Sequence, residues 1–318
     1  MSKTHEFKNY DALWQCPPEV APELWNQFAA EMKQADNMEV LDFPVQIDVE
    51  LNAGCNMRCP FCTHGYEKIE NTKMDLKHYF RMVDEAVANG AKSLKLNYIN
   101  EPMLRTDLED CIKYAKNAGI INIYMATNGS LLSESRRKKL IHSGITKIFV
   151  SIDAITPETY AKQRLDGKYY EKIVQNVVSL VEERNALGLE FPKVRVSFLK
   201  NALNQGEEKA FEDFWQDKVD VIAFQKMNEV PDRNTGLMVE TESEQQGCQF
   251  PFKQLVVAND GAILPCCKLY GRKLSLGNIA DTTLKQAWDS PKMTNLREIH
   301  KSGEWRNHEI CRACIQND

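Results

Sequence analysis

The part of the sequence best suited to chemistry is the run Gly54-Cys55-Asn56-Met57-Arg58-Cys59-Pro60-Phe61-Cys62. Its three cysteines, Cys55, Cys59 and Cys62, can ligate three irons of a 4Fe-4S cube and leave the fourth iron open. A cluster that only transfers electrons has four cysteine ligands, whereas an open iron can bind a small chelating ligand. The spacing therefore predicts an iron-sulfur enzyme.

A second group of cysteines lies near the end of the chain. Between residues 254 and 266, two apolar runs flank Asn259-Asp260-Gly261 and predict a β-hairpin, since Asp-Gly supplies the positive φ angles of a tight turn. The hairpin places two cysteines near its ends, where they can face one metal centre with the closing CxxC pair. A four-thiolate zinc site is the alternative, although zinc knuckles usually pair two close CxxC units. The cysteines after residue 247 are Cys248, Cys266, Cys267, Cys311 and Cys314.

The elements that position the first cysteine run follow a repeated βα pattern, in which short apolar runs alternate with amphipathic helical stretches. Six such units predict a parallel sheet that curls into a partial (β/α)6 TIM-like barrel, with the chemistry at the carboxyl ends of the strands. The cysteine run follows the first strand directly. Helices at 76–89, 108–117 and 170–186 each end near a glycine stop signal. The predicted strands are 44–51, 93–98, 121–126, 147–151, 193–199 and 219–224.

The chain divides into three predicted parts. Residues 1–44 form a helical extension that packs outside the barrel, and residues 45–230 form the barrel. Residues 231–318 form a linker and a small cluster-binding domain made of the hairpin plus a helix. The polar stretch 228–247 is predicted to be an exposed connection.

Composition limits the classes of partner. The chain has 318 residues, of which 43% are hydrophobic, so it can bury a large core. A net charge of -5 and a pI near 5.8 argue against a nucleic-acid or anionic-membrane surface. No apolar stretch approaches the roughly 18 residues of a membrane span, and the polar start lacks the apolar core of a signal peptide. We expect a cytoplasmic protein, in which cysteines serve metal binding or catalysis rather than disulfides.

The CxxxCxxC loop, with Phe61 before its last cysteine, resembles that of the radical S-adenosylmethionine (SAM) superfamily. The segment 97–102 occupies the place of that family's GGEP segment; it lacks the glycines and keeps Glu101 and Pro102. The resemblance extends to Thr127-Asn128-Gly129 after the third strand and to 151–154 after the fourth. It implies SAM-binding roles for Phe61, Asn100, Glu101, Asn128, Ser151 and Asp153.

The tail resembles the SPASM group of auxiliary-cluster domains in its shortened "twitch" form, whose opening half is matched by Cys248, Gly261 and Cys266. The full form continues with further cysteines beyond Cys314. The resemblance therefore implies two 4Fe-4S clusters, one that binds SAM and one auxiliary cluster. An electron donor such as flavodoxin or ferredoxin is implied as a partner. The expected auxiliary ligands are Cys248, Cys266, Cys311 and Cys314.

The resemblance implies a 5'-deoxyadenosyl radical that removes hydrogen from a small polar substrate, such as a sugar, an aminocyclitol or a related metabolite. The outcome is oxidation or epimerisation at a hydroxyl-bearing carbon. One alternative is a peptide-modifying enzyme of the same superfamily, which makes a crosslink or epimerises a residue in a precursor peptide. A non-catalytic iron-sulfur or zinc-binding module is the alternative from another class.

Two residues outside the motifs are candidates for catalysis. Cys267 follows the expected ligand Cys266 and has three interpretations: an alternative ligand, a hydrogen-atom donor or a packed small residue. Arg195 alternates with Val194 and Val196 on a predicted strand and can point into the barrel. There it needs a partner, either a substrate oxygen or an internal ion pair. Cys111 lies on the apolar side of a predicted helix and is expected to be a buried, inert thiol.

Overall fold

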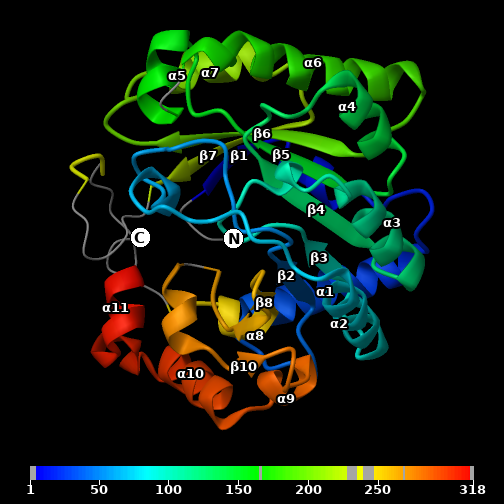
Figure 1. Ribbon diagram of the computed structural model, residues 1–318, viewed down its shortest axis with the longest axis vertical. Coiled ribbons are helices and arrows are strands. Elements are labelled where there is room, and N and C mark those ends of the chain that lie inside the picture. Colours follow the sequence, from blue (N-terminus) through cyan, green and yellow to red (C-terminus); the bar gives the residue numbers. More distant parts are fainter. Residues whose placement is uncertain (1–4, 165–166, 228–234, 239–246, 268, 316–318) are drawn as a thin grey trace.

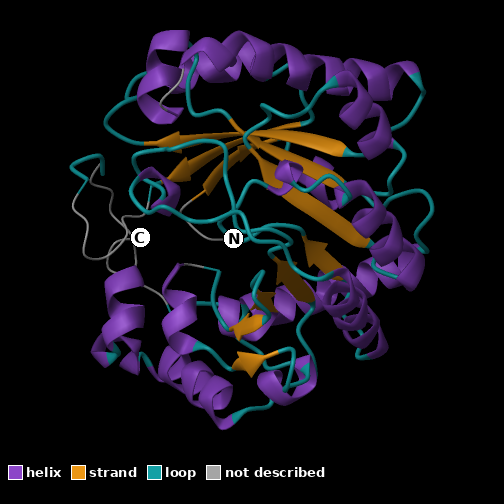
Figure 2. Ribbon diagram, in the orientation of Figure 1, coloured by secondary structure: helices purple, strands orange, loops and turns teal. Residues whose placement is uncertain are grey.

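The computed structural model describes residues 5–164, 167–227, 235–238, 247–267 and 269–315. Strands in these ranges form one sheet in the order β1-β7-β6-β5-β4-β3-β2-β8-β9-β10. Helices cover the outer side of its curved central part (Figures 1 and 2). Most of the predicted connection at 228–247 lies outside the described residues.

The strands from β7 to β8 in this order are parallel, and only the edges of the sheet are antiparallel. Strands β2 to β7 correspond to the six strands predicted from the sequence. The predicted partial barrel with a C-terminal hairpin is therefore confirmed. The strands are β1 His5–Lys8, β2 Gln46–Val49, β3 Ser93–Lys95, β4 Asn122–Thr127, β5 Lys147–Ser151, β6 Lys193–Lys200, β7 Val221–Lys226, β8 Gln254–Val257, β9 Ala262–Leu264 and β10 Gly277–Asn278.

The helices follow local stop and start signals. Helix α2 begins after Asp75, whose carboxylate accepts a hydrogen bond from the Lys77 amide at 2.9 Å, and is followed by Gly90 at φ +91°. No described helix is long and apolar enough to cross a membrane. The α-helices are α1 Pro22–Asp36, α2 Leu76–Ala88, α3 Leu108–Ala118, α4 Glu134–Ile141, α5 Pro157–Arg164, α6 Tyr170–Ala186, α7 Glu208–Trp215, α8 Phe250–Lys253, α9 Leu284–Trp288, α10 Pro291–Ser302 and α11 Glu309–Ile315.

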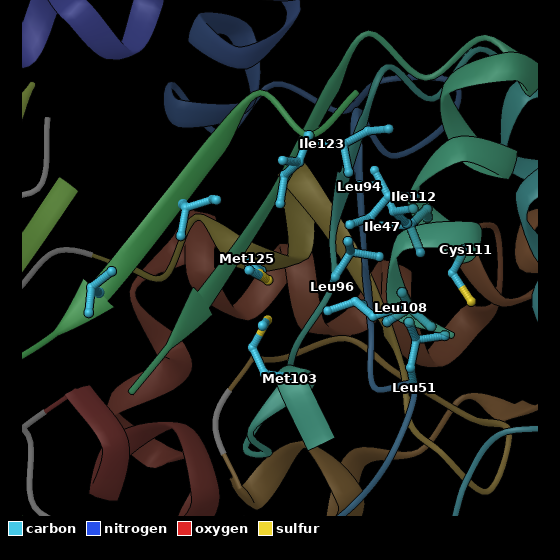
Figure 3. Close-up of a cluster of buried hydrophobic side chains, with 14 of the residues drawn as sticks. Ile47, Leu51, Leu94, Leu96, Met103, Leu108, Cys111, Ile112, Ile123 and Met125 are labelled. Carbon is cyan, nitrogen blue, oxygen red and sulfur yellow. The ribbon is translucent and has the colours of Figure 1, made fainter. Parts of the chain in front are cut away.

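The two faces of the curved sheet differ in chemistry, because successive side chains of a strand point to opposite faces. Ile47, Leu94 and Ile123 point outward and pack with Cys111 and Ile112 of α3, as Figure 3 shows. The buried Cys111 agrees with the expected inert thiol, and burial raises its pKa to about 12. Most of the alternate residues of the same strands are polar and face the inside of the barrel.

The N-terminal segment contains a strand that the sequence did not predict. Residues of β1 pair antiparallel with β7 in the register His5↔Gln225 to Lys8↔Ile222 and so form one edge of the sheet. A four-residue edge strand carries too little alternation to be recognised without its partner. The short 3-10 helix Tyr10–Trp14 and helix α1 follow.

The hairpin of the C-terminal part is joined to the barrel. Strand β8 pairs in parallel with β2, from Gln46↔Gln254 to Val49↔Val257, and β9 folds back antiparallel on β8. The turn requires Gly261, which has φ +84°; a Cβ at this position would lie 2.7 Å from the Asn278 Oδ1. The chain after β9 is thereby placed beside the first barrel strands.

The amino end of the barrel contains an ammonium group that pairs with no carboxylate of the described residues: Lys147 on β5. Its Nζ donates a hydrogen bond to Asn122 and lies 5.8 Å and 5.3 Å from the ring centroids of Trp14 and Trp25. Burial lowers the pKa of Lys147 from 10.5 to about 7. In the unfolded chain the Lys147 ammonium stays protonated up to its ordinary pKa of 10.5. Burying this charge on folding therefore costs free energy at neutral pH.

We expect Lys147→Met to raise the melting temperature at pH 7. The difference between the two pKa values lowers the free energy of unfolding by at most about 5 kcal/mol at and below pH 7. The contacts of Lys147 with the two indole rings offset part of this cost. Because the unfolded state binds more protons between pH 7 and 10.5, the stability of the wild type rises with pH across that range. The extra stability of Lys147→Met over the wild type therefore shrinks towards pH 10. Thermal unfolding at several pH values measures this. The exposed Lys77→Met serves as the control, and an unchanged pH slope in Lys147→Met would contradict the prediction.

Candidate active site

The cysteine loop begins directly after β2 and is fixed by its neighbours. The Gly54 amide donates to Asn71 Oδ1 at 3.0 Å, and the Gly54 carbonyl accepts from the Glu101 amide at 2.9 Å. A Cβ on Gly54 would lie 2.5 Å from the Asn71 side chain, so only glycine fits. The loop is thereby attached to the segment after β3.

The three thiols of the loop lie close enough to affect one another. Burial raises the pKa of Cys55 to about 11, and the charges of Glu101, Cys59 and Cys62 add to this. Burial and the charge of Cys59 also raise the pKa of Cys62. Such thiols are protonated until a metal displaces the protons. An all-sulfur donor set suits an iron-sulfur cluster, so Cys55, Cys59 and Cys62 are the residues that would hold it.

Glu101 links the carboxyl ends of β3 and β4. Its Oε1 accepts from Thr127 Oγ1 at 2.7 Å and from the Met103 amide at 3.0 Å, and its Oε2 accepts from the Asn128 amide at 2.7 Å. Burial raises the pKa of Glu101 despite these bonds. The carboxylate is thus engaged by the protein backbone, and it fixes Asn128 beside the loop.

Asn128 and Asn100 both reach the residues around the cysteine loop. The Asn128 Nδ2 donates to Asn56 Oδ1 at 2.8 Å, inside the CxxxCxxC run. The Asn100 Nδ2 donates to Asn52 Oδ1 at 3.2 Å, and its own Oδ1 accepts from the Tyr98 amide at 3.0 Å. The structure therefore brings these two predicted SAM-binding residues together with the loop.

An ion pair on the other side of the loop involves a residue that the sequence motifs did not identify. Arg164, at the end of α5, pairs with Asp153 and donates from Nη1 to Cys59 Sγ at 3.6 Å. Its guanidinium carbon lies 5.7 Å from the Phe61 ring centroid. Burial alone would lower the pKa of Arg164, but the charges of Asp153 and Cys59 raise it above its usual range. The arginine therefore brings a permanent positive charge to the cysteines.

Asp153 is fully used within the protein. Besides pairing with Arg164, its Oδ1 accepts from the Leu199 amide at 2.8 Å, and its backbone has φ +62°. Ser151 ends β5, in register with Ser197 of β6. Phe61, Asp153 and Arg164 thus form one contact group beside Cys59, and the structure does not bring Ser151 into that group. Nothing in the spacing of the sequence distinguishes Arg164, because its contacts with Cys59 and Phe61 come from a distant segment.

Three of the expected auxiliary ligands, Cys248, Cys311 and Cys314, lie close together, and Cys267 lies beside them. Burial raises the pKa of Cys248, and the nearby thiols Cys267, Cys314 and Cys311 raise it further. Burial and Cys314 raise the pKa of Cys311 to about 12. Cys311 and Cys314 are three residues apart on α11, so they share a helix face. This is again a donor set of sulfur atoms, as an iron-sulfur cluster requires.

The adjacent Cys266 and Cys267 both lie near Tyr98, whose pKa they raise together with burial. Cys267 also packs against the cluster of Tyr98, Val256, Ala258 and Leu264 on the inner side of the barrel. From the ligand pattern we expect Cys266→Ala to lower bound iron by one cluster, whereas Cys267→Ala keeps it. Iron and sulfide analysis of the reconstituted variants measures this. The opposite result would make Cys267 the ligand.

Arg195 lies on the inner face, as expected, but without the internal ion pair. Its guanidinium carbon is 3.6 Å from the Phe149 ring centroid, and among the described residues no carboxylate pairs with it. Burial lowers the pKa of Arg195 to about 10. The charge of Arg195 and that of Cys267 each shift the pKa of Lys95 and of Tyr124. The two candidate catalytic residues therefore approach the same pair of inner side chains.

Comparison with known families agrees with both motifs. The family model of the radical SAM superfamily matches residues 49–185. The family model of an iron-sulfur cluster-binding domain, SPASM, matches residues 248–315. These ranges contain, respectively, the CxxxCxxC loop with the strands that follow it, and the auxiliary cysteines.

Two curated proteins illustrate the range of relatives. The chain is 24% identical over 274 residues to an S-adenosyl-L-methionine-dependent 2-deoxy-scyllo-inosamine dehydrogenase of Niallia circulans, covering 84% of this chain and 91% of the dehydrogenase. It is 31% identical over 152 residues to a probable GTP 3',8-cyclase of Methanococcus maripaludis, covering 48% of this chain. The chain spans about half the length (49%) of that cyclase.

A solved structure has a similar fold. The crystal structure of BtrN in complex with AdoMet and 2-DOIA superposes with a TM-score of 0.57 and 20% sequence identity. The superposition covers 85% of this chain and 92% of BtrN. At this identity the likeness concerns the fold, which is a partial barrel followed by a small C-terminal part.

Proposed function

Because this chain belongs to the radical SAM superfamily and carries a C-terminal SPASM cluster-binding domain, we propose that it oxidises or epimerises a small polar substrate at a hydroxyl-bearing carbon. The substrate class is a sugar, an aminocyclitol or a related metabolite. When bound, the cluster and SAM supply a 5'-deoxyadenosyl radical that removes a hydrogen atom from an unactivated carbon.

The observation that carries the proposal is that Arg195 and Cys267 both lie near Lys95 and Tyr124 at the inner face. Arg195 comes from β6 and Cys267 from the segment after β9, yet the charge of each shifts the pKa of both Lys95 and Tyr124. Such a group of polar side chains inside the barrel can hold a polar substrate below the cysteine loop. Arg195 donates hydrogen bonds to a substrate oxygen in this arrangement, because its Nε has no partner among the described residues.

The dehydrogenase relative supports oxidation over other outcomes. Its name states action on 2-deoxy-scyllo-inosamine, and the similarity covers nine-tenths of that protein, 91%. Epimerisation requires a hydrogen-atom donor on the opposite face of the carbon, for which Cys267 is the candidate thiol. In oxidation the substrate radical instead loses a proton and an electron, for which the auxiliary cluster would be the acceptor, and no thiol is needed as a hydrogen-atom donor.

The test uses anaerobically reconstituted protein with SAM and dithionite, which replaces the expected flavodoxin or ferredoxin. Candidate substrates that carry deuterium at each hydroxyl-bearing carbon are supplied, and 5'-deoxyadenosine is analysed by mass spectrometry. We expect deuterium transfer from one such carbon into 5'-deoxyadenosine. Turnover only with a precursor peptide would contradict it and favour the peptide-modifying alternative.

Cys267→Ala separates the two outcomes. In an epimerase the variant still forms 5'-deoxyadenosine, but the inverted product and its solvent-derived hydrogen are lost. In a dehydrogenase the variant still forms the ketone. Product analysis in deuterium oxide distinguishes them, and Cys111→Ala, a buried cysteine outside the site, is the matched control.

A further inference from the structure

The inner face of the barrel carries a layer of charged and aromatic side chains on neighbouring strands. The register aligns Asp48 of β2 with Lys95 of β3, and Lys95 with Tyr124 of β4. On the far side it aligns Phe149 of β5 with Arg195 of β6. The rings of Tyr124 and Phe149, whose centroids are 5.3 Å apart, join the two sides.

The one carboxylate of this layer is saturated by protein groups. Asp48 accepts from Gln46 Nε2 at 2.6 Å, from Gln254 Nε2 at 3.0 Å and from Lys95 Nζ at 3.1 Å. The Asp48 side chain is 1% exposed, whereas that of Lys95 is 21% exposed. The side of the pair that a ligand can reach is therefore the ammonium.

The other acids near this face have their own cations. Glu50, the residue that follows β2, lies 3.6 Å from Arg272. Asp153 at the end of the barrel pairs with Arg164. Neither leaves a carboxylate for Arg195.

Arg195 is the second cation of the layer and has no anionic partner among the described residues. Its contacts are the Phe149 ring, at 3.6 Å from the centroid, and the field of Tyr124 and Tyr10. Its Nε is buried without a hydrogen bond to any described residue. A half-buried guanidinium that lacks an anion is costly. The layer therefore has two cations, Lys95 and Arg195, for one carboxylate.

We propose that the substrate carries an anionic group, a carboxylate or a phosphate, which Arg195 binds with Lys95 beside it. This inference rests on the proposed function and narrows its substrate class. A guanidinium presents paired donors that match both groups. The anion restores neutrality to the layer, whereas the ammonium of an unmodified amine would meet two positive charges. The substrate is thus an acidic or phosphorylated member of the proposed class.

The test measures anion binding by the holoenzyme with SAM present. Inorganic phosphate and acetate are titrated calorimetrically against chloride at equal ionic strength, up to about 50 mM, which detects millimolar affinity. Binding of either anion through Arg195 supports the inference, and the anion preferred distinguishes a phosphate from a carboxylate. Arg195→Gln is expected to weaken binding by at least about tenfold, and Arg195→Lys to retain part of it.

Two further variants keep the test independent of folding defects. The double variant Asp48→Asn with Lys95→Gln removes both members of the ion pair, so that neither charge is left without its partner. It is expected to weaken anion binding by at least about threefold. Lys147→Met removes a cation from the amino end of the same barrel and is expected to bind as the wild type does. Wild-type affinity in Arg195→Gln, or no binding of either anion to wild-type protein, would overturn the inference.

Release of 5'-deoxyadenosine by the same wild-type preparation separates this inference from the proposed function. Anion binding through Arg195 without 5'-deoxyadenosine contradicts the proposed function and leaves the anion site standing. Release of 5'-deoxyadenosine without anion binding contradicts the anion site alone.

Discussion

Replacing Cys59 with alanine is expected to abolish 5'-deoxyadenosine release, with a loss of at least about 1000-fold. The thiol is one of three that would hold the SAM-binding cluster, and it alone receives the hydrogen bond from Arg164 at 3.6 Å. Without it the loop offers two sulfur ligands, which are too few for a cube with one open iron. The measurement is 5'-deoxyadenosine by liquid chromatography after anaerobic incubation with SAM and dithionite.

Cys111→Ala is the matched control for this variant. Cys111 is also buried, but it packs against the outer face of the sheet among apolar residues (Figure 3). Its loss is expected to leave 5'-deoxyadenosine release within about twofold of wild type. The Cys59 variant should retain the iron of the auxiliary cluster, since Cys248, Cys311 and Cys314 are untouched. Undiminished 5'-deoxyadenosine release by Cys59→Ala would refute the assignment of the loop.

Arg164→Gln is expected to destabilise the folded protein by about 3 to 5 kcal/mol. The arginine neutralises the Asp153 carboxylate, whose side chain is 2% exposed, so the variant leaves a buried charge without its partner. The same change removes the positive charge beside Cys59 and so weakens the site as well. Thermal unfolding of the holoenzyme and its 5'-deoxyadenosine release report the two effects separately.

A double-mutant cycle with Asp153→Asn isolates the ion pair. If the cost arises from the unpaired carboxylate, Arg164→Gln combined with Asp153→Asn is more stable than Arg164→Gln alone. The exposed pair of Lys138 and Glu134 provides a control, because breaking a fully exposed ion pair has little effect on stability. Equal melting temperatures for wild type and Arg164→Gln would show that the pair has no structural role.

The sequence by itself determined the chemistry of the cysteine loop and most of the elements that carry it. Cys55, Cys59 and Cys62 are close in the chain, so their spacing fixes how they can share one cluster. Strands β2 to β7 and helix α6 were predicted because their apolar runs and glycine stops are local signals. The hairpin of β8 and β9 was predicted from Asp260-Gly261 for the same reason.

Only the tertiary structure decided how distant segments meet. The pairing of β1 with β7 and of β8 with β2 joins both ends of the chain to one sheet, and no short-range pattern specifies such partners. Arg164 contacts Cys59, which lies 105 residues earlier in the chain. Arg195 on strand β6 and Cys267 in the segment after β9 both lie near Lys95. Spacing along the chain encodes contacts made within one loop or helix. Which buried charge finds a partner, and which is left for a ligand, depends on the packing of the whole barrel.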